Sequence, residues 1–266
     1  MMKNWLAALA AVAAGPVWAQ VDPPRFCPNR PDIGASSCTV DPGRMLFEVS
    51  AVDWQREDDA DAQADSVLLG DFQARIGVDG RTEVQLSWTP YGRSRVRDKT
   101  SGRVSTVEGV GDVRLGLRRN LRNPGGEGLS IAVEPFVRLP LGRDRLGAGD
   151  WGGGVVVPIN YELAPRVDAG MTLEADAAVD GDGSGRHSAY SAAFGLGYAL
   201  TERFGTVVEI QIGRDDDPAG GSTLALGALS FVFQPRDGFQ LDMFAAAGLN
   251  RSSPDFRFLT GAAFLF

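Results

Sequence analysis

Residues 256–266 alternate strictly between two sets of side chains. A strand sends successive side chains to opposite faces, so one face of this segment is apolar and aromatic. If this strand stood at the edge of a sheet in a soluble protein, its unpaired backbone groups would favour aggregation. In a closed barrel the last strand pairs with the first, so no edge is left. The segment therefore favours the closing strand of a membrane barrel over a core strand of a soluble β-sandwich. The apolar parity consists of Phe256, Phe258, Thr260, Ala262, Phe264 and Phe266.

The same alternation recurs upstream and predicts an all-β fold, an antiparallel transmembrane β-barrel of about twelve strands. Val84 and Leu86, for example, have the opposite parity to Glu83 and Gln85. Only one face can touch hydrocarbon, so the charged sets must line the lumen. Residues 223–234 are ambiguous, because both parities are apolar. The predicted strands are 43–57, 66–78, 81–97, 109–122, 129–141, 152–164, 167–180, 188–201, 204–215, 223–234, 239–251 and 256–266.

The connectors between these strands alternate in size, which is typical of outer-membrane barrels. An even number of strands would place both termini on the side of the short turns, the periplasm. The tight turns are 79–80, 165–166, 202–203 and 236–238. The longer polar connectors are 58–65, 98–108, 143–151, 181–187 and 215–222.

The start of the chain indicates export. Met1–Asn4 is positive, residues 5–17 are apolar, and Ala19 ends a small-residue cleavage site, so residues 1–19 are predicted to be a signal peptide. No later stretch has the length of apolar residues that a transmembrane helix needs. We expect residues 20–42 to form a Pro-rich periplasmic segment and residues 43–266 to form a single outer-membrane barrel.

Composition supports a barrel with many turns and a polar lumen. The chain has 34 Gly, 2 Cys and 1 His, with a mean hydropathy of −0.09. The net charge of −8 argues against nucleic acid as a partner. Cys27 and Cys38 lie close together in an exported chain, so we predict that they form a disulfide. Metal binding by this pair is the lesser alternative, because a structural zinc site usually needs four ligands.

The predicted lumen face carries a surplus of acids over bases. These groups act either as a selectivity lining or as a salt-bridged filling of a narrow barrel. We expect the filling role for most of them, with a minority along a narrow path. Glu48, Glu162 and Asp168 share this face. The pore-lining candidates are Asp71, Arg75, Glu83, Gln85, Asp112, Arg114, Arg118, Glu134, Arg138, Glu174, Asp176, Glu209, Asp242 and Arg257.

Two acidic loops invite a calcium interpretation, but the residues favour solvated loop tips. The sequence Asp180-Gly-Asp182-Gly-Ser184-Gly has Ser191 where an EF-hand loop needs Glu, so that motif fails. His187 is the only histidine, and a hydrolase would need it beside a serine such as Ser184 or Ser188. No nucleophile motif matches, so we predict no catalytic residue, no metal site and no cofactor.

Several motifs in order resemble one family, called "putative MetA-pathway of phenol degradation". The first is residues 29–48, with Asn-Arg-Pro-Asp-Ile at 29–33 and Val-Asp-Pro-Gly-Arg-Met-Leu-Phe-Glu at 40–48. The others are residues 74–86, 109–116, 139–142 and 202–209, and residues 241–266 with the final Phe266. The resemblance implies an outer-membrane β-barrel, often described as a transporter. The two cysteines depart from the family's core pattern.

Together these observations predict an outer-membrane channel or transporter for small solutes. Hydrophobic or aromatic compounds are suggested only by the family's description. The alternative is a largely closed structural or binding barrel, and the third is an outer-membrane hydrolase. The expected partners are outer-membrane lipid, a small-molecule solute, and the barrel-assembly machinery, which would recognise the strand that ends at Phe266.

Overall fold

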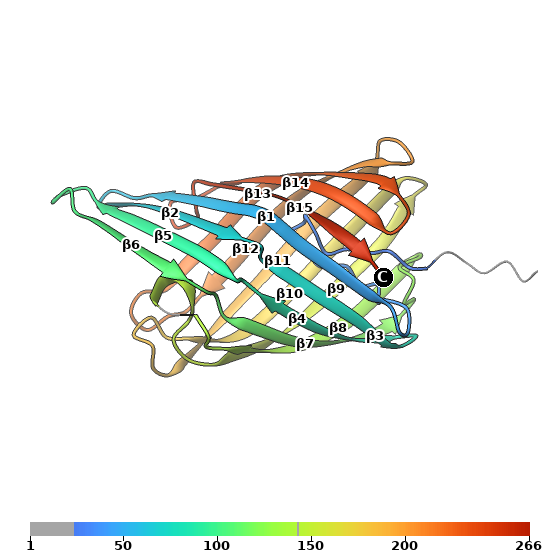
Figure 1. Ribbon diagram of the computed structural model, residues 1–266, viewed down its shortest axis with the longest axis horizontal. Coiled ribbons are helices and arrows are strands. Elements are labelled where there is room, and N and C mark those ends of the chain that lie inside the picture. The colour runs from blue at the N-terminus through green and yellow to red at the C-terminus, as the bar shows by residue number, and fades with distance from the viewer. Residues whose placement is uncertain (1–23, 143) are drawn as a thin grey trace, which may run out of the picture.

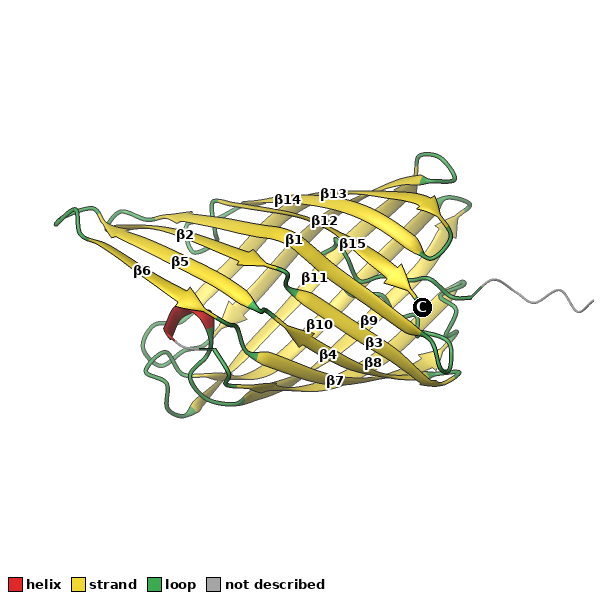
Figure 2. Ribbon diagram, in the orientation of Figure 1, coloured by secondary structure: helices red, strands yellow, loops and turns green. Residues whose placement is uncertain are grey.

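The computed structural model describes residues 24–142 and 144–266 and is a barrel built from antiparallel strands (Figures 1 and 2). The predicted signal peptide lies outside these residues. The strands are β1 (Met45–Asp58), β2 (Ala62–Leu69), β3 (Phe72–Asp79), β4 (Thr82–Trp88), β5 (Tyr91–Asp98), β6 (Val104–Gly109), β7 (Val113–Arg122), β8 (Leu129–Leu139), β9 (Gly152–Ala164), β10 (Val167–Val179), β11 (Arg186–Ala199), β12 (Phe204–Asp215), β13 (Ser222–Arg236), β14 (Phe239–Gly248) and β15 (Phe256–Leu265). A short 3₁₀ turn, η1, covers Asp144–Leu146.

The barrel closes between its first and last strands, as the terminal segment predicts. β15 pairs antiparallel with both β14 and β1. The last residue completes this seam, because Phe266 N donates to Met45 O at 2.8 Å and Met45 N donates to Phe266 O at 3.1 Å. Closure leaves the aromatic edge with a full set of partners, which removes the aggregation hazard of an open edge.

The sheet is a closed twelve-strand barrel in which three of the strands are interrupted. β2 with β3, β4 with β5, and β6 with β7 are the two parts of single wall strands. The first two pairs fall largely within the predicted strands 66–78 and 81–97, whereas β6 falls almost entirely within the predicted connector 98–108. Gly70 adopts a positive φ of 69°, and Pro90 has no N–H to give to a ladder. Thr89 Oγ1 donates to Asp71 Oδ1 at 2.6 Å across the first two breaks. The sequence pattern predicted continuous strands here, because a break changes the backbone without disturbing the alternation on either side.

The two ends of the barrel differ, and we name them the turn end and the loop end. Both the C-terminus and the first described residues lie at the turn end (Figure 1). At the loop end, β1, β2, β5 and β6 project beyond the rest of the wall (Figure 1). The connectors predicted at 58–65 and 98–108 are therefore mostly strand, with only 59–61 and 99–103 outside it. Among the described residues, no helix is long and apolar enough to cross a membrane.

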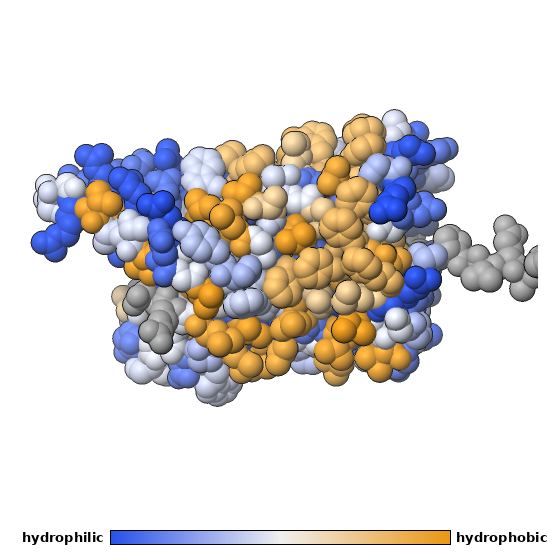
Figure 3. Space-filling view, viewed as in Figure 1, coloured by the Kyte–Doolittle hydropathy of each residue, from blue (hydrophilic) through white to orange (hydrophobic). Residues whose placement is uncertain are grey.

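The face of the barrel in Figure 3 carries an apolar belt between two polar ends. Leu115, Leu117 and Leu173 point outward with 40–46% of their surface exposed, as their parity predicts. Aromatic rings collect at the turn end, where Phe204 stacks on Phe233 and Phe239 stacks on Phe264 at centroid distances of 4.4 and 4.9 Å. Such a belt, bordered by an aromatic girdle, matches the hydrocarbon and interface of a bilayer.

The ambiguous strand is explained by a second apolar surface inside the barrel. On β13, Leu229 and Phe231 face outward, whereas Ala228 is buried and packs with Phe244, Ala246 and Leu259. Ile33, from the segment before β1, packs against this inner cluster. Both parities of β13 are apolar because one faces outward and the other faces this segment.

Candidate functional site

The segment before β1 lies inside the barrel. We call residues 24–42 the plug. Its hydrogen-bond partners come from strands all around the wall, among them β1, β4, β7, β9, β10, β12 and β14. A segment held from every side by inward-facing groups occupies the lumen. The expectation of a segment outside the barrel is therefore replaced by a plug near the turn end.

Wall carboxylates hold the plug through its main chain. N–H groups in an extended segment have no ladder partner and need acceptors when they are buried. A charged acceptor makes a shorter and stronger bond than a neutral one. The bonds run from Asn29 N and Arg30 N to Glu48 Oε2 (2.9 and 2.8 Å), from Ile33 N and Gly34 N to Glu209 (2.8 and 2.9 Å), and from Val40 N to Glu83 Oε2 (2.8 Å).

Neutral polar side chains hold the middle of the plug. Thr172 Oγ1 accepts from Ala35 N at 2.8 Å, and Asn160 Oδ1 accepts from Ser37 N at 2.7 Å. On the other side of the lumen, Asn120 Nδ2 donates to Ser37 O at 2.7 Å. The plug is therefore fixed at closely spaced points along its length.

The predicted disulfide between Cys27 and Cys38 is present and closes a ring within the plug. Arg75 holds this ring from the wall, since its Nη1 donates to Cys27 O at 2.8 Å and its Nη2 donates to Cys38 O at 3.0 Å. The side chain of Arg75 thus binds the main chain at both disulfide-bonded residues.

Four charged residues among the pore-lining candidates form a buried network between the barrel wall and the plug. Arg75 Nε lies 2.8 Å from Glu83 Oε1, Arg118 Nη2 lies 2.7 Å from Glu134 Oε2, and Arg118 Nη1 links back to Glu83 at 3.5 Å. All four side chains are at most 2% exposed. Gln85 donates to Glu134 at 3.1 Å and to Glu83 at 2.8 Å. These residues fill the wall side of the lumen, as the salt-bridged interpretation expects.

Two of the cavities in the lumen lie against the plug's middle, one on each side. The cavity towards the turn end has a volume of about 470 Å³ and the one towards the loop end about 270 Å³. Both are lined by Asp32, Gly34, Ala35 and Thr172. These four residues, which we call the constriction, therefore separate the two spaces.

Asp32 is the ionisable group of the constriction. Its Oδ1 atom is buried and has no hydrogen-bond partner. Burial, and then the negative charge of Glu209, raises the pKa of Asp32 to about 8, with smaller contributions from Asp242 and Glu48. A carboxyl of this kind is neutral at the pH where ordinary aspartates are ionised.

The remaining candidates divide by depth along the lumen. Asp71, Arg114, Glu174 and Arg257 line the cavity on the loop side, together with Asp53, whose Oδ2 lies 2.6 Å from Arg257 Nη2. Arg138 and Asp176 lie nearer the loop end, around a small cavity beside Phe136. Asp242 is buried and pairs with Arg30 of the plug. Asp112 fastens the β8–β9 loop, accepting from Gly142 N at 2.9 Å and Ala148 N at 2.8 Å.

Sequence reasoning missed Asp53 and the plug residues. Ser50 and Asp53 both face inward although their parities differ, because a β-bulge shifts the register between Ser50 and Val52. Asn29, Arg30 and Asp32 were missed because an extended segment has no periodicity to reveal its contacts. One feature of the sequence did indicate a segment inside the barrel. The predicted lumen has more carboxylates than arginines, and several of the surplus acids bond to the plug's N–H groups.

The serines near His187 do not face it. Ser184 Oγ donates to Asp182 Oδ1 at 2.9 Å, whereas the ring of His187 lies against Asp180 and Asp215. Within residues 180–191 the structure therefore forms no serine–histidine pair of the kind that a hydrolase needs.

An apolar belt around a charged lumen is the architecture of outer-membrane β-barrel proteins. The chain belongs to the family described as "Putative MetA-pathway of phenol degradation", which matches residues 28–266. The resemblance seen in the sequence is thereby confirmed, and the match includes most of the plug.

Solved structures share the fold. The NanC porin is 8% identical with a TM-score of 0.51, and the comparison covers 83% of this chain and 98% of that one. The translocator domain of the autotransporter NalP from Neisseria meningitidis is 11% identical with a TM-score of 0.52, covering 84% and 88%. At these identities the likeness is one of fold alone. No curated protein sequence matches the chain.

Proposed function

We propose that the protein is an outer-membrane channel for small solutes, and that its plug sets the width of the path. The observation that carries this proposal is the pair of cavities in one lumen, with the constriction between them. A barrel filled throughout by its own side chains would have no such spaces. Movement of a few plug residues would join the two cavities.

The proposed orientation places the turn end, and with it both termini, in the periplasm. Short turns on the periplasmic side and longer loops outside are the rule for barrels of this class. Phe266 is 60% exposed at this end, beside the stacked ring of Phe264. We include in the proposal that this terminal strand is what the barrel-assembly machinery recognises.

The lining favours cations and small neutral polar solutes over anions. The cavity on the turn side is lined by five acids and, among the described residues, by no lysine or arginine. Acidic walls raise the local concentration of cations and repel anions. Aromatic solutes are supported only by the family's description. The five acids are Glu127, Glu162, Asp168 and Glu209, together with Asp32, whose raised pKa keeps it from adding charge at neutral pH.

Conductance across planar bilayers tests the proposal. The double variant Glu48→Gln/Glu209→Gln weakens four of the main-chain bonds that hold the plug, so we expect several-fold larger conductance than in the unaltered protein. The matched control is Glu108→Gln/Glu202→Gln, which changes two exposed glutamates and should leave conductance unchanged. Absence of conductance in all three proteins would refute a channel and favour the closed structural or binding barrel.

A further inference from the structure

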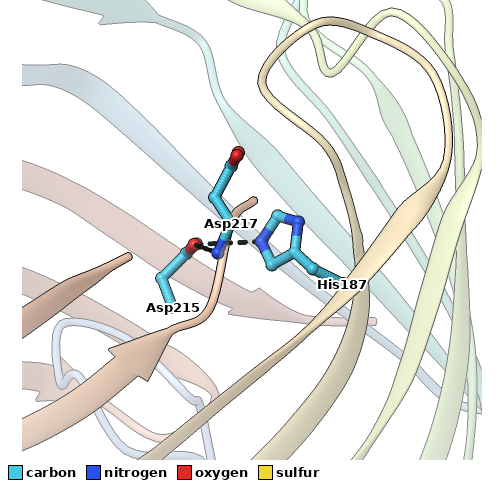
Figure 4. Close-up of side chains that lie close together, drawn as sticks. All are labelled: His187, Asp215 and Asp217. Atoms are coloured by element: carbon cyan, nitrogen blue, oxygen red, sulfur yellow. Dashed lines mark hydrogen bonds and ion pairs between the residues drawn. The ribbon is translucent and has the colours of Figure 1, made fainter. Parts of the chain in front are cut away.

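Three metal-ligating side chains from neighbouring segments meet at the loop end (Figure 4). His187 lies near the start of β11, Asp215 ends β12, and Asp217 lies in the β12–β13 loop. One ligand atom from each residue lies within 4.8 Å of the other two. The cluster is separate from the lumen cavities and from the plug, so the proposed channel does not account for it.

The orientation of His187 points to a cation. Its side chain is only 6% exposed, and its Nδ1 lies 2.9 Å from Asp180 Oδ1. A proton on Nδ1, donated to Asp180, leaves the lone pair of Nε2 directed at the cluster. Nε2 is buried, lies 2.9 Å from Asp215 Oδ1 and makes no hydrogen bond of regular geometry. A nitrogen lone pair and a carboxylate oxygen at this distance repel one another unless a positive charge, either a proton or a metal ion, lies between them.

The arrangement matches the way proteins orient metal-binding histidines. A ligating imidazole nearly always donates its other N–H to a carboxylate or carbonyl, which fixes the ring and raises its basicity. Asp180 supplies that carboxylate. Asp217 is fixed by main-chain donors, because Gly181 N lies 2.6 Å from its Oδ2 and Ala219 N lies 2.7 Å from its Oδ1. Each carboxylate oxygen retains a second lone pair for a metal.

Two glycines let the loop fold around these carboxylates. A Cβ atom at Gly185 would lie 2.4 Å from Asp180 Oδ2, and this residue has a φ of +80° that disfavours other side chains. A Cβ atom at Gly181 would lie 2.9 Å from Asp217 Oδ2. The loop is therefore shaped to bring the carboxylates close to the ring.

We propose that His187, Asp215 and Asp217 form a site for a divalent transition-metal ion, Zn²⁺ in particular, which joins the start of β11 to the end of β12 and to the β12–β13 loop. Imidazole nitrogen with carboxylate oxygen suits Zn²⁺, whereas Ca²⁺ takes oxygen ligands. Three protein ligands leave a fourth position for water. The side chain of Asp215 is 46% exposed, so an ion reaches the site from the solvent at the loop end.

Isothermal titration of the full barrel in detergent with ZnCl₂, after treatment with a chelator, tests the site. We expect one saturable ion per chain. His187→Ala should weaken binding by at least about tenfold, and Asp180→Asn by about tenfold or more, because loss of an outer partner has effects of that order. Co²⁺ in place of Zn²⁺ gives a second readout, a visible absorption band that His187→Ala should abolish.

The control is Asp216→Asn. Like Asp180→Asn it removes one negative charge, and its position lies between the proposed ligands Asp215 and Asp217. Its side chain lies 2.7 Å from Arg214 Nε and takes no part in the cluster. Heat-modifiable migration on gels verifies that each variant is a folded barrel. The proposal is overturned if Zn²⁺ does not bind saturably, which would leave an ion pair of His187 only. It is equally overturned if His187→Ala binds normally, if Asp216→Asn loses as much affinity, or if Ca²⁺ binds as tightly regardless of His187.

Discussion

Nη2 of Arg30 lies 2.8 Å from Oδ1 of Asp242, although 212 positions separate the two residues in the chain. The side chain of Asp242 is fully buried, and that of Arg30 is 13% exposed. A buried charge that loses its partner is left uncompensated, which is far more costly than removing both charges. This pair therefore fastens the plug to β14.

We predict that Arg30→Ala releases the plug and raises conductance several-fold. The double variant Arg30→Ala/Asp242→Asn should fold better than the single one, because no unpaired charge remains in the lumen. Single-channel recording and protease cleavage of the plug measure the two effects. Arg44→Ala, at an exposed position after the plug, is the control and should behave like the unaltered protein. If Arg30→Ala left both the conductance and the resistance of the plug to protease unchanged, the fastening role of Arg30 would be contradicted.

The pKa of Asp32, raised from 3.8 to about 8 mainly by burial, predicts that the plug responds to pH. Between these values the folded protein binds a proton that the unfolded chain has lost, so stability falls as the pH rises through this window. Above about 8 the carboxylate is charged beside Glu209, and repulsion loosens the constriction. Conductance should therefore increase as the pH rises through this value. Asp32→Asn should remove the step, and a step that persists in this variant would assign it to another group.

Adjacent positions on β10 should respond differently to the same substitution. Leu173 faces outward and is 40% exposed, whereas Thr172 is 8% exposed and lines the constriction. Leu173→Arg should cost roughly 2–4 kcal/mol near the bilayer midplane, and Leu200→Arg about 0–1 kcal/mol because it lies in a turn near the interface. Urea unfolding in lipid vesicles measures these costs. If Leu173→Arg were as stable as the unaltered protein while Thr172→Arg failed to fold, the assigned faces would be inverted.

Removal of the disulfide should loosen the plug but leave the wall intact. Cys27→Ser/Cys38→Ser breaks no strand pairing, since both residues precede β1. The two carbonyls that Arg75 holds would no longer be tied together, so the plug gains freedom. We expect normal heat-modifiable migration with faster proteolysis within residues 24–42. Loss of the folded barrel would show instead that the ring is needed for assembly.

Ion selectivity follows from the acidic cavity on the turn side. Reversal potentials in a salt gradient should report a preference for cations over anions. The preference should weaken as salt is added, because solvent-exposed charges are screened over ~8–10 Å near physiological ionic strength. Glu162→Gln/Asp168→Asn, on the lining of that cavity, should reduce the preference. Anion selectivity in the unaltered protein would refute the predicted sign.

The sequence specified the wall because a strand reports its two faces locally. Leu115 faces outward and Arg118 is buried, as alternation alone predicts. The breaks at Gly70 and Pro90 were missed because each leaves the alternation on both sides in place. Asp53 was missed because a bulge adds one residue and reverses the parity beyond it.

The plug could not be predicted, because its position depends on contacts between residues far apart in the chain. Glu209 bonds to Ile33 N across 176 positions, and nothing near either residue indicates the other. Alternation alone places the side chains of Glu83 and Glu209 inward, where both are buried, but it does not reveal the segment that they bind. Cys27 and Cys38 were the exception, because their short separation indicated a local pairing.

Because wall carboxylates accept hydrogen bonds from main-chain N–H groups of the plug, part of the plug's attachment does not depend on its side chains. Every amino acid except proline offers that N–H, so the bonds to Glu48, Glu83 and Glu209 do not depend on which side chain the donating residue carries. Only the positions that donate need to avoid proline. The same barrel wall could then hold plugs of different sequence, and channels of different width could be engineered by substitutions within residues 32–36 alone.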